Sequence, residues 1–432
     1  MRKMVGLLLS AVVVAGHGTA ALAQGSSAAA TVNPVVEWNK TLLVIVRTSG
    51  AQPATVHPTR SFAIMHAAIY DAVNAIERSH EPYLVELGRV PATASRDAAA
   101  SVAAHDVLSA LYPTFQATLD AQLSQELTAL PADANTTQGE DLGHAVAAAI
   151  LDLRRDDGSA AQPIPFLFVN APGQYQSTPP NFPPQPQFTH WSHVTPFVLA
   201  GADQFRPGPP PALTSNTYAD SFNQVKALGI ANSTAATPDQ ALIGRFWNGA
   251  IQNYWNEIAQ TAALRHGLTT TDSARLFALL NLSLADSVIA FYDAKYTYNF
   301  WRPVTAIRAA DPRTNAETQP DPNWLPEAGK TANDPSYPGA HAAISAAAQT
   351  VLVTFFGTDH FQLDVTSEVL PGIERHFESF SGAEREASLS RVFAGVHFLT
   401  DEQAGETLGR QVADFVCDYS LQPEEHKERT TP

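Results

Sequence analysis

The spacing of apolar residues limits what this 432-residue chain can fold into. Between about Val35 and Leu153 the sequence is rich in alanine, and apolar side chains recur in steps of three and four, as at Phe62, Met65 and Ile69. That spacing is typical of amphipathic helices. Alternation with a period of two is rare, and valine- and isoleucine-rich runs bounded by turn residues are nearly absent. With 45% hydrophobic residues the chain can bury a large core, so we expect an all-α fold.

A proline-rich segment interrupts the helical patterns. Residues 163–211 hold 13 of the 31 prolines, a density that neither a helix nor the interior of a sheet can accommodate. We therefore expect a long loop over residues 163–213, with Phe188, Trp191 and Phe197 anchoring it to the body of the protein. A loop of this length is often a lid or a partner-binding arm. A connector that wraps the surface is an equally good interpretation.

Helical patterns continue after this loop. One pattern covers Thr237–Ala262, beginning at a threonine that can cap a helix, and another follows the three threonines at 269–271. We expect N-terminal helices over residues 35–160 and further helices, carrying the functional residues, over 237–420. No internal repeat and no clear boundary divides the sequence. Residues 24–432 are therefore predicted to form a single domain, and the sequence leaves open whether chains associate into a homo-oligomer.

The first residues have the pattern of an export signal. Arg2 and Lys3 precede an apolar stretch over Met4–Ala15, and Ala21–Ala23 is a small-residue cleavage site. We predict a signal peptide over residues 1–23, cleavage near Ala23, and export to the periplasm or the medium. No later run approaches the roughly 18 to 20 uninterrupted apolar residues of a membrane helix, so we expect no integral membrane segment.

Charge and cysteine content exclude several classes of protein. The formal net charge of −16 argues against nucleic acid and anionic membranes as partners. Cys417 is the only cysteine, so the chain forms no intramolecular disulfide and offers no cysteine-ligated cluster or zinc site. Cys417 lies in a helical pattern, and we expect a buried, inert thiol.

The first of three short blocks in the last third of the chain is Lys295–Pro303, KYTYNFWRP. Lys295 and Arg302 are seven residues apart and would project from one face of a helix. Pro303 disfavours helix at Arg302, which would place the guanidinium at the helix end. Aromatic neighbours favour a partly buried pair that needs a counter-anion, whereas the alternative is a solvated basic face.

The second block is Pro335–His341, PSYPGAH, and it precedes an alanine-rich apolar run to Phe356 that should be helical. The free N–H groups and positive dipole end of such a helix can bind an anion. Gly339 would allow close approach of the backbone, and His341 would stand in the first turn. A histidine at a helix start is more often structural than catalytic, and both interpretations stay open here.

The third block is Ser390–Asp401, SRVFAGVHFLTD. Arg391 and His397 are six residues apart and would diverge on a straight helix, but Gly395 between them can bend the chain so that both reach one point. Thr400 and Gln403 resemble a capping box that opens the last helix. Asp401 would then lie close enough to orient the ring of His397, although a carboxylate in a first helical turn can also act on the dipole alone.

Together the blocks supply three fixed cations and two histidines, a set that suits a tetrahedral oxyanion such as phosphate or vanadate. The order K-x6-RP, PxxPGAH and SR-x5-H-x3-D resembles the vanadium-dependent haloperoxidase and type 2 phosphatidic acid phosphatase superfamily, over roughly residues 286–409. The resemblance implies an all-α fold of helical bundles, with the site in the core of one bundle. It also implies a vanadate cofactor, with phosphate able to occupy the same site.

The resemblance assigns residues to the binding of that cofactor. Lys295, Arg302 and Arg391 would neutralise the oxygens of the oxyanion. The backbone at Gly339 and Ala340 would add N–H donors. His341 would also belong to this set, together with His397 as the ligand of the metal.

The resemblance assigns catalytic roles as well. His397 would bind vanadium through a ring nitrogen, oriented by Asp401. His341 would act as acid and base when hydrogen peroxide binds, and Lys295 would polarise the peroxide. The product would be hypohalous acid, with bromide or iodide as the favoured halide. On the same scaffold a phosphatase would use His397 as nucleophile and His341 as general acid toward a small phosphate ester. A phosphate- or vanadate-binding protein without turnover is the third hypothesis.

Two departures from the family pattern affect the chemistry. The family usually has Ser-Gly-His where this chain has Gly339, Ala340 and His341, so a hydroxyl donor to the oxyanion is missing. Loss of one such donor from a preorganised site can cost on the order of 3 kcal/mol. Asp334 stands where haloperoxidases tend to have an aromatic or imidazole ring, and an ionised carboxylate there would repel halide.

Other histidines have simpler interpretations. His190 and His193 have a spacing that can bind metal, but no third ligand is adjacent, so we do not expect a metal site there. His57, His66 and His105 lie in helical patterns and are predicted to be hydrogen-bonded core residues. The sequence has no Walker A loop, G-x-G-x-x-G or HExxH, so nucleotide-dependent and zincin activities have no support.

Overall fold

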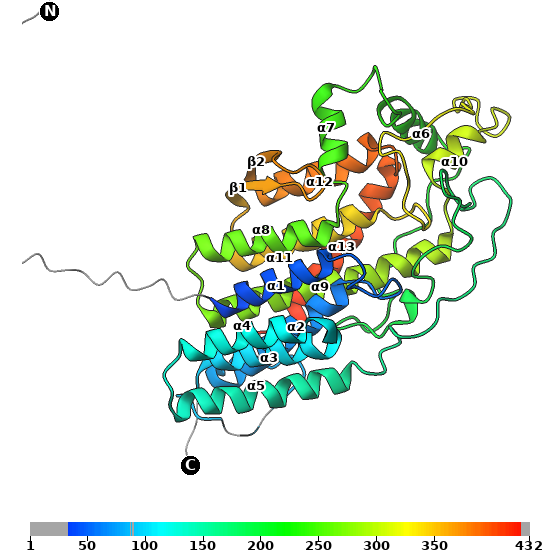
Figure 1. Cartoon of the computed structure of the whole chain (residues 1–432). Coiled ribbons are helices and arrows are strands. Elements are labelled where there is room, and N and C mark those ends of the chain that lie inside the picture. The colour runs from blue at the N-terminus through cyan, green and yellow to red at the C-terminus, as the bar shows by residue number, and fades with distance from the viewer. Residues whose placement is uncertain (1–32, 87, 89, 425–432) are drawn as a thin grey trace, which may run out of the picture. The chain divides into compact units, whose positions relative to one another are not determined.

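Helices dominate the computed structural model, which describes residues 33–86, 88 and 90–424 (Figure 1). The prediction of an all-α fold is confirmed. The predicted signal peptide over residues 1–23 lies outside the described residues.

The N-terminal helices form one side of the fold, and their ends follow local capping rules. Asn33, Ser95 and Asp133 each precede a helix and accept backbone N–H groups of its first turn. Helix α2 is buried along almost its whole length, against α3, α5 and the later helix α9. The elements are α1 (Pro34–Arg47), α2 (Thr59–Glu77), α3 (Arg96–Leu111), the 3₁₀ turn η1 (Pro113–Phe115), α4 (Gln116–Thr128) and α5 (Ala134–Leu153).

The proline-rich segment is a loop, as predicted. Between α5 and the next α-helix the only regular element among the described residues is the short 3₁₀ turn η2 (Trp191–His193). Trp191 is buried at the loop's attachment to the body, and Phe197 is nearly so. The carboxylate of Asp286 accepts the N–H groups of Phe197 at 2.6 Å and of the next two residues at 2.7 and 2.9 Å. The long loop is therefore fixed to the helical core at these points.

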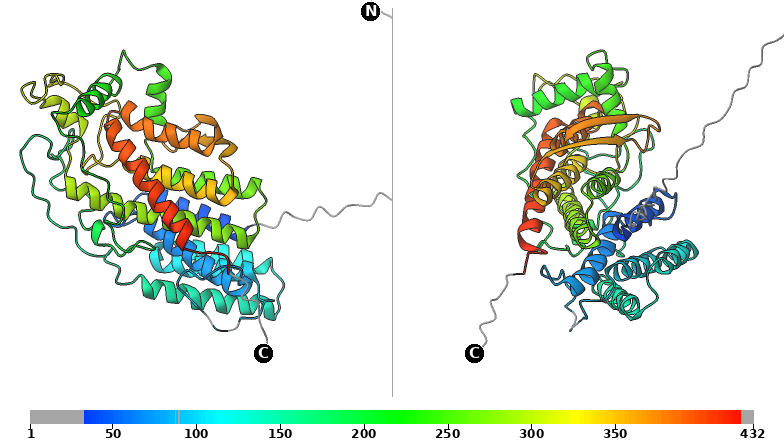
Figure 2. Two further views of the ribbon diagram at one scale, coloured as in Figure 1. Left: turned by 180° about the vertical axis from the view of Figure 1, so that it is seen from behind. Right: turned by 90° about the vertical axis from the view of Figure 1, so that its left-hand side faces the viewer.

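Helix α9 lies at the centre of the fold, where it packs on α2 on one side and on α11 and α13 on the other (Figures 1 and 2). Among the described residues α9 is long and apolar enough to cross a membrane, but 94% of its most apolar window is buried inside the protein, as in a core helix. The elements are α6 (Asn216–Leu228), α7 (Pro238–Phe246), α8 (Ile251–Arg265), α9 (Thr270–Tyr298), α10 (Pro303–Arg308), α11 (Ala340–Phe356), α12 (Phe380–Phe393) and α13 (Leu399–Tyr419).

Three features differ from the sequence predictions. Helix α6 begins at Asn216, well before the expected start at Thr237. The predicted helix over Thr237–Ala262 is two helices, because the chain leaves the helix at Trp247 and enters α8 only at Ile251. An antiparallel hairpin of β1 (His360–Thr366) and β2 (Glu374–Ser379) follows α11. The sequence HFQLDVT alternates polar and apolar residues, in step with the alternating burial of β1. Seven residues are too few to predict a strand between two helices.

Candidate active site

The N-terminus of α11 lies at the centre of the three blocks. Gly339 is its N-cap and His341 stands in its first turn, as predicted. The N–H of Gly339 donates to the carbonyl oxygen of Asp401 over 2.8 Å, so this donor is already used and the expected role of Gly339 as an anion donor is not supported. Ala340 opens the helix, and first-turn N–H groups have no acceptor within their own helix. The positive end of the α11 dipole adds to the attraction for an anion.

The first block brings Lys295 and Arg302 together by a different route from the one expected. Helix α9 ends at Tyr298, because Asn299 adopts a left-handed conformation with φ 50°. Arg302 therefore lies outside α9 and is the N-cap of α10, so the two cations do not share a helix face. Both side chains are nonetheless buried and reach the same carboxylate, that of Asp334. The two cations therefore meet because the chain reverses direction after Asn299, and not because of their spacing along one helix.

The third block bends at Gly395, as the sequence predicts. Helix α12 ends at Phe393, and Gly395 has φ 75°, which places His397 in the short connector before α13. Helix α13 starts at Leu399 with Phe398 as its N-cap, two residues earlier than expected, and the predicted capping box of Thr400 and Gln403 does not form. The Asp401 carboxylate accepts the N–H of Phe398 over 3.0 Å and caps the helix instead.

The hydrogen bonds of His397 define its tautomer. The guanidinium of Arg302 lies 2.9 Å from Nε2 and can only donate, so Nε2 is an acceptor. Nδ1 therefore carries the proton and faces the Asp401 carboxylate at 3.2 Å. The hydroxyl of Ser336 donates to the same Asp401 oxygen over 2.5 Å and fixes it in place. The Nε2 lone pair accepts the N–H of Arg302 in this structure, so binding a metal through Nε2 would require Arg302 to release it.

Burial sets the protonation states of this cluster. It lowers the pKa of His397 well below its ordinary value, and the nearby charge of Arg302 acts in the same direction. Burial also lowers the pKa of Lys295 to about 8, partly offset by the negative charge of Asp334. Burial raises the pKa of Asp401 to about 6. At neutral pH the site therefore contains a neutral His397 ring beside buried cations.

A connector between α7 and α8 positions the other histidine and the third cation. One ring nitrogen of His341, Nε2, donates to the carbonyl oxygen of Trp247 over 3.0 Å. Arg391 donates through Nη1 to the side-chain oxygen of Asn248 over 3.2 Å, while its buried Nε has no partner among the described residues. Burial, and secondly the charge of Arg391, lowers the pKa of His341 well below its ordinary value. The ring is neutral, and Nδ1 is the nitrogen that can accept a proton.

The family comparison covers the helices that carry this cluster. Residues 275–423 match the family model described as the VCPO second helical-bundle domain, and the range includes all three blocks. This part of the chain is therefore similar to the second helical bundle of vanadium chloroperoxidases. The resemblance inferred from the three sequence blocks is thereby confirmed.

Individual relatives extend this match beyond residues 275–423. The chain is 25% identical over 350 residues to vanadium chloroperoxidase of Curvularia inaequalis, which covers 62% of this chain and 57% of that protein. The chain therefore matches little more than half of that relative's length. A bacterial vanadium-dependent iodoperoxidase structure superposes with a TM-score of 0.77 at 24% identity, over 91% of this chain and 97% of the other. A holo-type bacterial vanadium-dependent chloroperoxidase gives 0.62 at 16% identity, over 90% and 93%. These structures show that the fold is shared.

The residues present fit a tetrahedral oxyanion such as vanadate. Three buried cations lie around the N-terminus of a helix, and the buried Nε of Arg391 still lacks a partner among the residues described. An orphaned donor in the interior is unfavourable unless a further acceptor binds there. The unprotonated Nε2 of His397 supplies the remaining ligand. The buried cations and the histidine nitrogen could therefore hold such an anion, whereas the Gly339 N–H and the serine hydroxyl are not available as donors.

Four further residues take part in the site but were not identified from the sequence. The hydroxyl of Ser336 fixes Asp401, and the connector residues Trp247 and Asn248 hold His341 and Arg391. Glu402 is fully buried against Gly339. The Asn-Gly step after Trp247 is a turn signal that could have revealed the connector. Nothing in the sequence placed Glu402 beside Gly339, because that contact depends on how α13 packs on α11.

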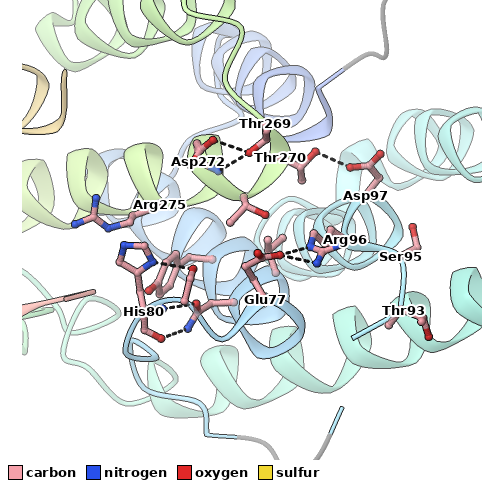
Figure 3. A pocket seen from close by; sticks show the side chains of 16 residues that line it. Glu77, His80, Thr93, Ser95, Arg96, Asp97, Thr269, Thr270, Asp272 and Arg275 are labelled. Atoms are coloured by element: carbon pink, nitrogen blue, oxygen red, sulfur yellow. Dashed lines mark hydrogen bonds and ion pairs between the residues drawn. The ribbon is translucent and has the colours of Figure 1, made fainter. Parts of the chain in front are cut away.

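A cavity of about 790 Å³ lies away from the candidate active site, near the starts of α3 and α9 (Figure 3). Its polar groups are mutually paired. Glu77 and Arg96 form an ion pair at 2.6 Å, and Thr270 donates to Asp97 over 2.5 Å. None of the residues of the three blocks lines this cavity. Its size alone does not make it a functional site.

Three other histidines that the sequence singled out, His57, His66 and His105, have structural roles. His66 is buried, stacks on Phe277 and hydrogen-bonds through Nε2 to Asn39 at 2.8 Å, as predicted for a core residue. His57 bonds the hydroxyl of Thr59 at 2.9 Å among aromatic rings. His57 precedes α2 and is only partly buried, so its predicted core position is wrong. His105 is hydrogen-bonded as predicted, but it is only partly buried. It lies between two acidic side chains, those of Asp106 and Asp120.

His190 and Cys417 complete the sequence candidates. His190 lies at the η2 turn, where it is buried and packs edge-on against Trp191. No cluster of three potential metal ligands from histidine, cysteine, aspartate or glutamate occurs in the described part of the chain. Cys417 is buried, and burial raises the pKa of its thiol to about 12, so the predicted inert thiol is confirmed.

Proposed function

We propose that this protein is a vanadate-dependent haloperoxidase that oxidises halide with hydrogen peroxide to hypohalous acid. The observation that supports this most strongly is the orientation of His397, whose unprotonated Nε2 is held toward Arg302 by the Asp401 contact at Nδ1. Bound vanadate supplies the Lewis-acid centre at which hydrogen peroxide is activated for oxygen transfer. In the net reaction halide is oxidised to hypohalous acid, hydrogen peroxide is reduced to water, and one proton is consumed.

The chain's own groups would bind and orient the reactants. His397 would hold vanadium through Nε2, and Asp401 keeps its ring in the required tautomer. Lys295, Arg302 and Arg391 neutralise the oxyanion, with the first-turn N–H groups of α11 as additional donors. Cationic groups bind an anion more strongly where water is excluded, because the lower dielectric strengthens the attraction.

Proton transfer would be the task of His341. Its Nε2–H is committed to the carbonyl oxygen of Trp247, so the transferred proton is accepted and returned at Nδ1. The ring is neutral at neutral pH and is therefore able to act first as a base. Lys295 donates toward the peroxide and polarises it.

Bromide or iodide, the more easily oxidised halides, is the favoured substrate in this proposal. The Asp334 carboxyl group lies 3.8 Å from Lys295 Nζ, beside the cations that would attract halide, and competes for them. The serine hydroxyl usual in the family is absent at Gly339. Both features reduce the stabilisation available for the harder oxidation of chloride. A protein of the same fold is described as a vanadium-dependent iodoperoxidase.

A phosphatase is the second candidate, favoured by the same neutral and oriented His397. Its Nε2 can attack phosphorus as readily as it can bind vanadium, because phosphate and vanadate are both tetrahedral oxyanions. In this reaction His341 would have to enter protonated to assist the leaving group. Burial lowers the pKa of His341 well below its ordinary value, which makes the acid role less favourable than the base role.

Parallel assays of one preparation distinguish these functions. Purified protein is incubated with orthovanadate and assayed for bromide and iodide oxidation by hydrogen peroxide, and a vanadate-free portion is assayed on an aryl phosphate. We expect halide oxidation that requires vanadate, and that H397A lacks. Aryl phosphate hydrolysis inhibited by vanadate, without halide oxidation, would establish the phosphatase instead. Tight vanadate or phosphate binding with neither activity would leave a binding protein.

A further inference from the structure

The connector between α7 and α8 makes two contacts of the candidate active site. The backbone carbonyl of Trp247 accepts the Nε2–H of His341 over 3.0 Å, and the side-chain oxygen of Asn248 accepts an Nη1–H of Arg391 over 3.2 Å. These two connector residues are adjacent in the chain, so a displacement of the connector would move both contacts together. Whatever fixes the connector therefore also fixes the histidine assigned to proton transfer and one of the three cations.

The end of strand β1 fixes the start of the connector. The hydroxyl of Ser367, the residue that follows β1, donates to the carbonyl oxygen of Phe246 over 2.7 Å. The hydroxyl of Tyr254 donates to the same carbonyl over 2.9 Å and accepts the N–H of Glu368 over 3.1 Å. Both hydroxyl-bearing side chains are buried. The backbone that leads into Trp247 is thus held by two donors.

The side chain of Glu368 fixes the other end of the connector. Its Oε2 accepts the N–H of Ala250, the N-cap of α8, over 3.1 Å, and its Oε1 accepts the side-chain amide of Asn253 over 2.8 Å. Ala250 has no capping side chain, so Glu368 brings an acceptor to this helix end from another element. Arg47 of α1 pairs with Oε1 over 2.6 Å and fixes the carboxyl group in turn.

The middle of the connector passes directly against the same groups. A Cβ atom built on Gly249 would lie 2.8 Å from Oε2 of Glu368 and 2.8 Å from the hydroxyl oxygen of Tyr254, so residue 249 has no space for a side chain. We call Ser367 and Glu368 the hairpin clamp. It bonds to the connector at both ends and contacts it in between.

We propose that Glu368 is a positioning residue of the candidate active site, which acts through the connector and not on a reactant. The inference rests on the proposed function, because it concerns groups assigned to that reaction. It also gives the β1–β2 hairpin a role. Strand β1 starts four residues after α11 ends, and it brings the hairpin clamp back to the connector, which contacts the first turn of α11.

Loss of the Glu368 carboxyl group would release the start of α8, because the Ala250 N–H and the Asn253 amide would both lose their acceptor. A misplacement of about 1 Å caused by a change remote from the chemistry can cost on the order of 100-fold. Since Arg391 is bonded to the connector, the displacement should weaken oxyanion binding. Glutamine has the same length and keeps one acceptor oxygen, so it should retain most of the hold.

The first test measures binding of inorganic phosphate and of orthovanadate to the full chain by calorimetry. E368A should bind both ions roughly 10-fold more weakly or worse, and E368Q within about threefold of the wild type. Glu257 is the other acidic partner of Arg47, at 2.9 Å, and no hydrogen bond joins its side chain to the connector in the described part of the chain. E257A is therefore a matched control that should bind like the wild type. Wild-type affinity in E368A would overturn the inference.

The second test asks whether Glu368 acts through the connector. N248A alone should weaken phosphate binding, because Arg391 loses its acceptor. If Glu368 positions Asn248, the further loss caused by E368A should shrink to less than about twofold in the N248A background. A general loss of structure would instead add to the effect of N248A in full. Additive losses would therefore show that Glu368 is merely structural.

The variant S367A keeps the test decisive if E368A does not fold. It removes one hydroxyl from the carbonyl of Phe246 and leaves Tyr254 bonded there. Its phosphate affinity should fall by roughly threefold or more, and this loss should also disappear in the N248A background. Unchanged affinity of S367A would contradict the hairpin clamp.

The inference and the proposed function fail in different ways. If the wild type binds neither phosphate nor orthovanadate, the proposed function fails, and the positioning role fails with it. If the wild type binds either ion and E368A binds it equally well, only the positioning role is lost.

Discussion

The carboxylate of Asp334 forms a buried ion pair with the guanidinium of Arg302, and its Oδ1 also lies 3.8 Å from Nζ of Lys295. The same guanidinium contacts Nε2 of His397 at 2.9 Å. Two of the three cations of the site therefore already contact an internal carboxyl group. An incoming oxyanion must share them with Asp334.

Removal of that internal charge should change stability and affinity in opposite directions. D334N leaves buried cations without a counter-charge, and breaking a buried pair in this way costs about 3 to 5 kcal/mol. Affinity for orthovanadate should rise by at least about tenfold, because juxtaposed like charges cost several kcal/mol. Denaturant unfolding with and without phosphate, together with calorimetry, measures both quantities. Saturating phosphate should restore much of the lost stability.

The exposed pair of Asp311 and Arg313 provides the control for this experiment. D311N removes the same charge from the surface, where ion pairs contribute little, and should change neither quantity. If D334N bound vanadate more weakly than the wild type, Asp334 would have to help hold the oxyanion rather than compete with it.

The bend at Gly395 should be sensitive to a single methyl group. Gly395 has φ 75°, and a Cβ there would lie 3.0 Å from the carbonyl carbon of Gly229 and closer still to its oxygen. G395A should lose several kcal/mol of unfolding free energy, of which about 1 to 2 kcal/mol is the left-handed conformation itself. Vanadate affinity should fall too, since Arg391 and His397 flank the bend.

Gly357 separates the two contributions at Gly395. It has φ 69°, but the position that a Cβ would take there has no other atom within 4 Å, so G357A should lose only the conformational part. Equal losses for G395A and G357A, measured by denaturant unfolding, would show that the contact with Gly229 does not restrict the bend.

Buried His66 should make the protein less stable in acid. Burial lowers its pKa from the ordinary 6.5 to about 3, so below pH 6.5 the unfolded chain binds a proton that the folded protein does not. Stability is then fully present above pH 6.5 and falls by about 1.4 kcal/mol per pH unit as the pH drops toward 3.

The variant H66Q isolates this contribution, because glutamine can keep a hydrogen bond to Asn39 and does not titrate in this range. Unfolding free energies of H66Q and the wild type, measured between pH 7 and about pH 4, should converge as the pH falls. Parallel pH profiles for the two proteins would mean that His66 is protonated in the folded state or accessible to water.

Local rules in the sequence predicted much of the fold and of the site. The helical spacing predicted the all-α fold, and the density of proline predicted the loop after Leu153. Gly395 indicated a bend that the structure contains. Each of these predictions depends on the conformational preference of residues adjacent in the chain. Such preferences act whatever the tertiary surroundings are.

The errors arose where a long-range contact decides the outcome. The left-handed conformation of Asn299 ends α9 early, and the cations then meet through Asp334 rather than along one helix face. Trp247 and Asn248 reach the site only because the connector after α7 packs beside α11 and α12. Glu402 meets Gly339 only through the close packing of α13 on α11. No spacing rule within one segment contains that information.

Titration of the wild type, H397A and the surface variant H376A with orthovanadate decides whether His397 is the vanadium ligand. His376 is exposed and paired with Asp364, so its removal controls for the loss of any histidine. Calorimetry and vanadium NMR should show tight binding by the wild type and H376A, and none by H397A, which lacks the ring nitrogen held beside Arg302. Vanadate binding by H397A with the affinity of the wild type would show that another group holds the vanadium.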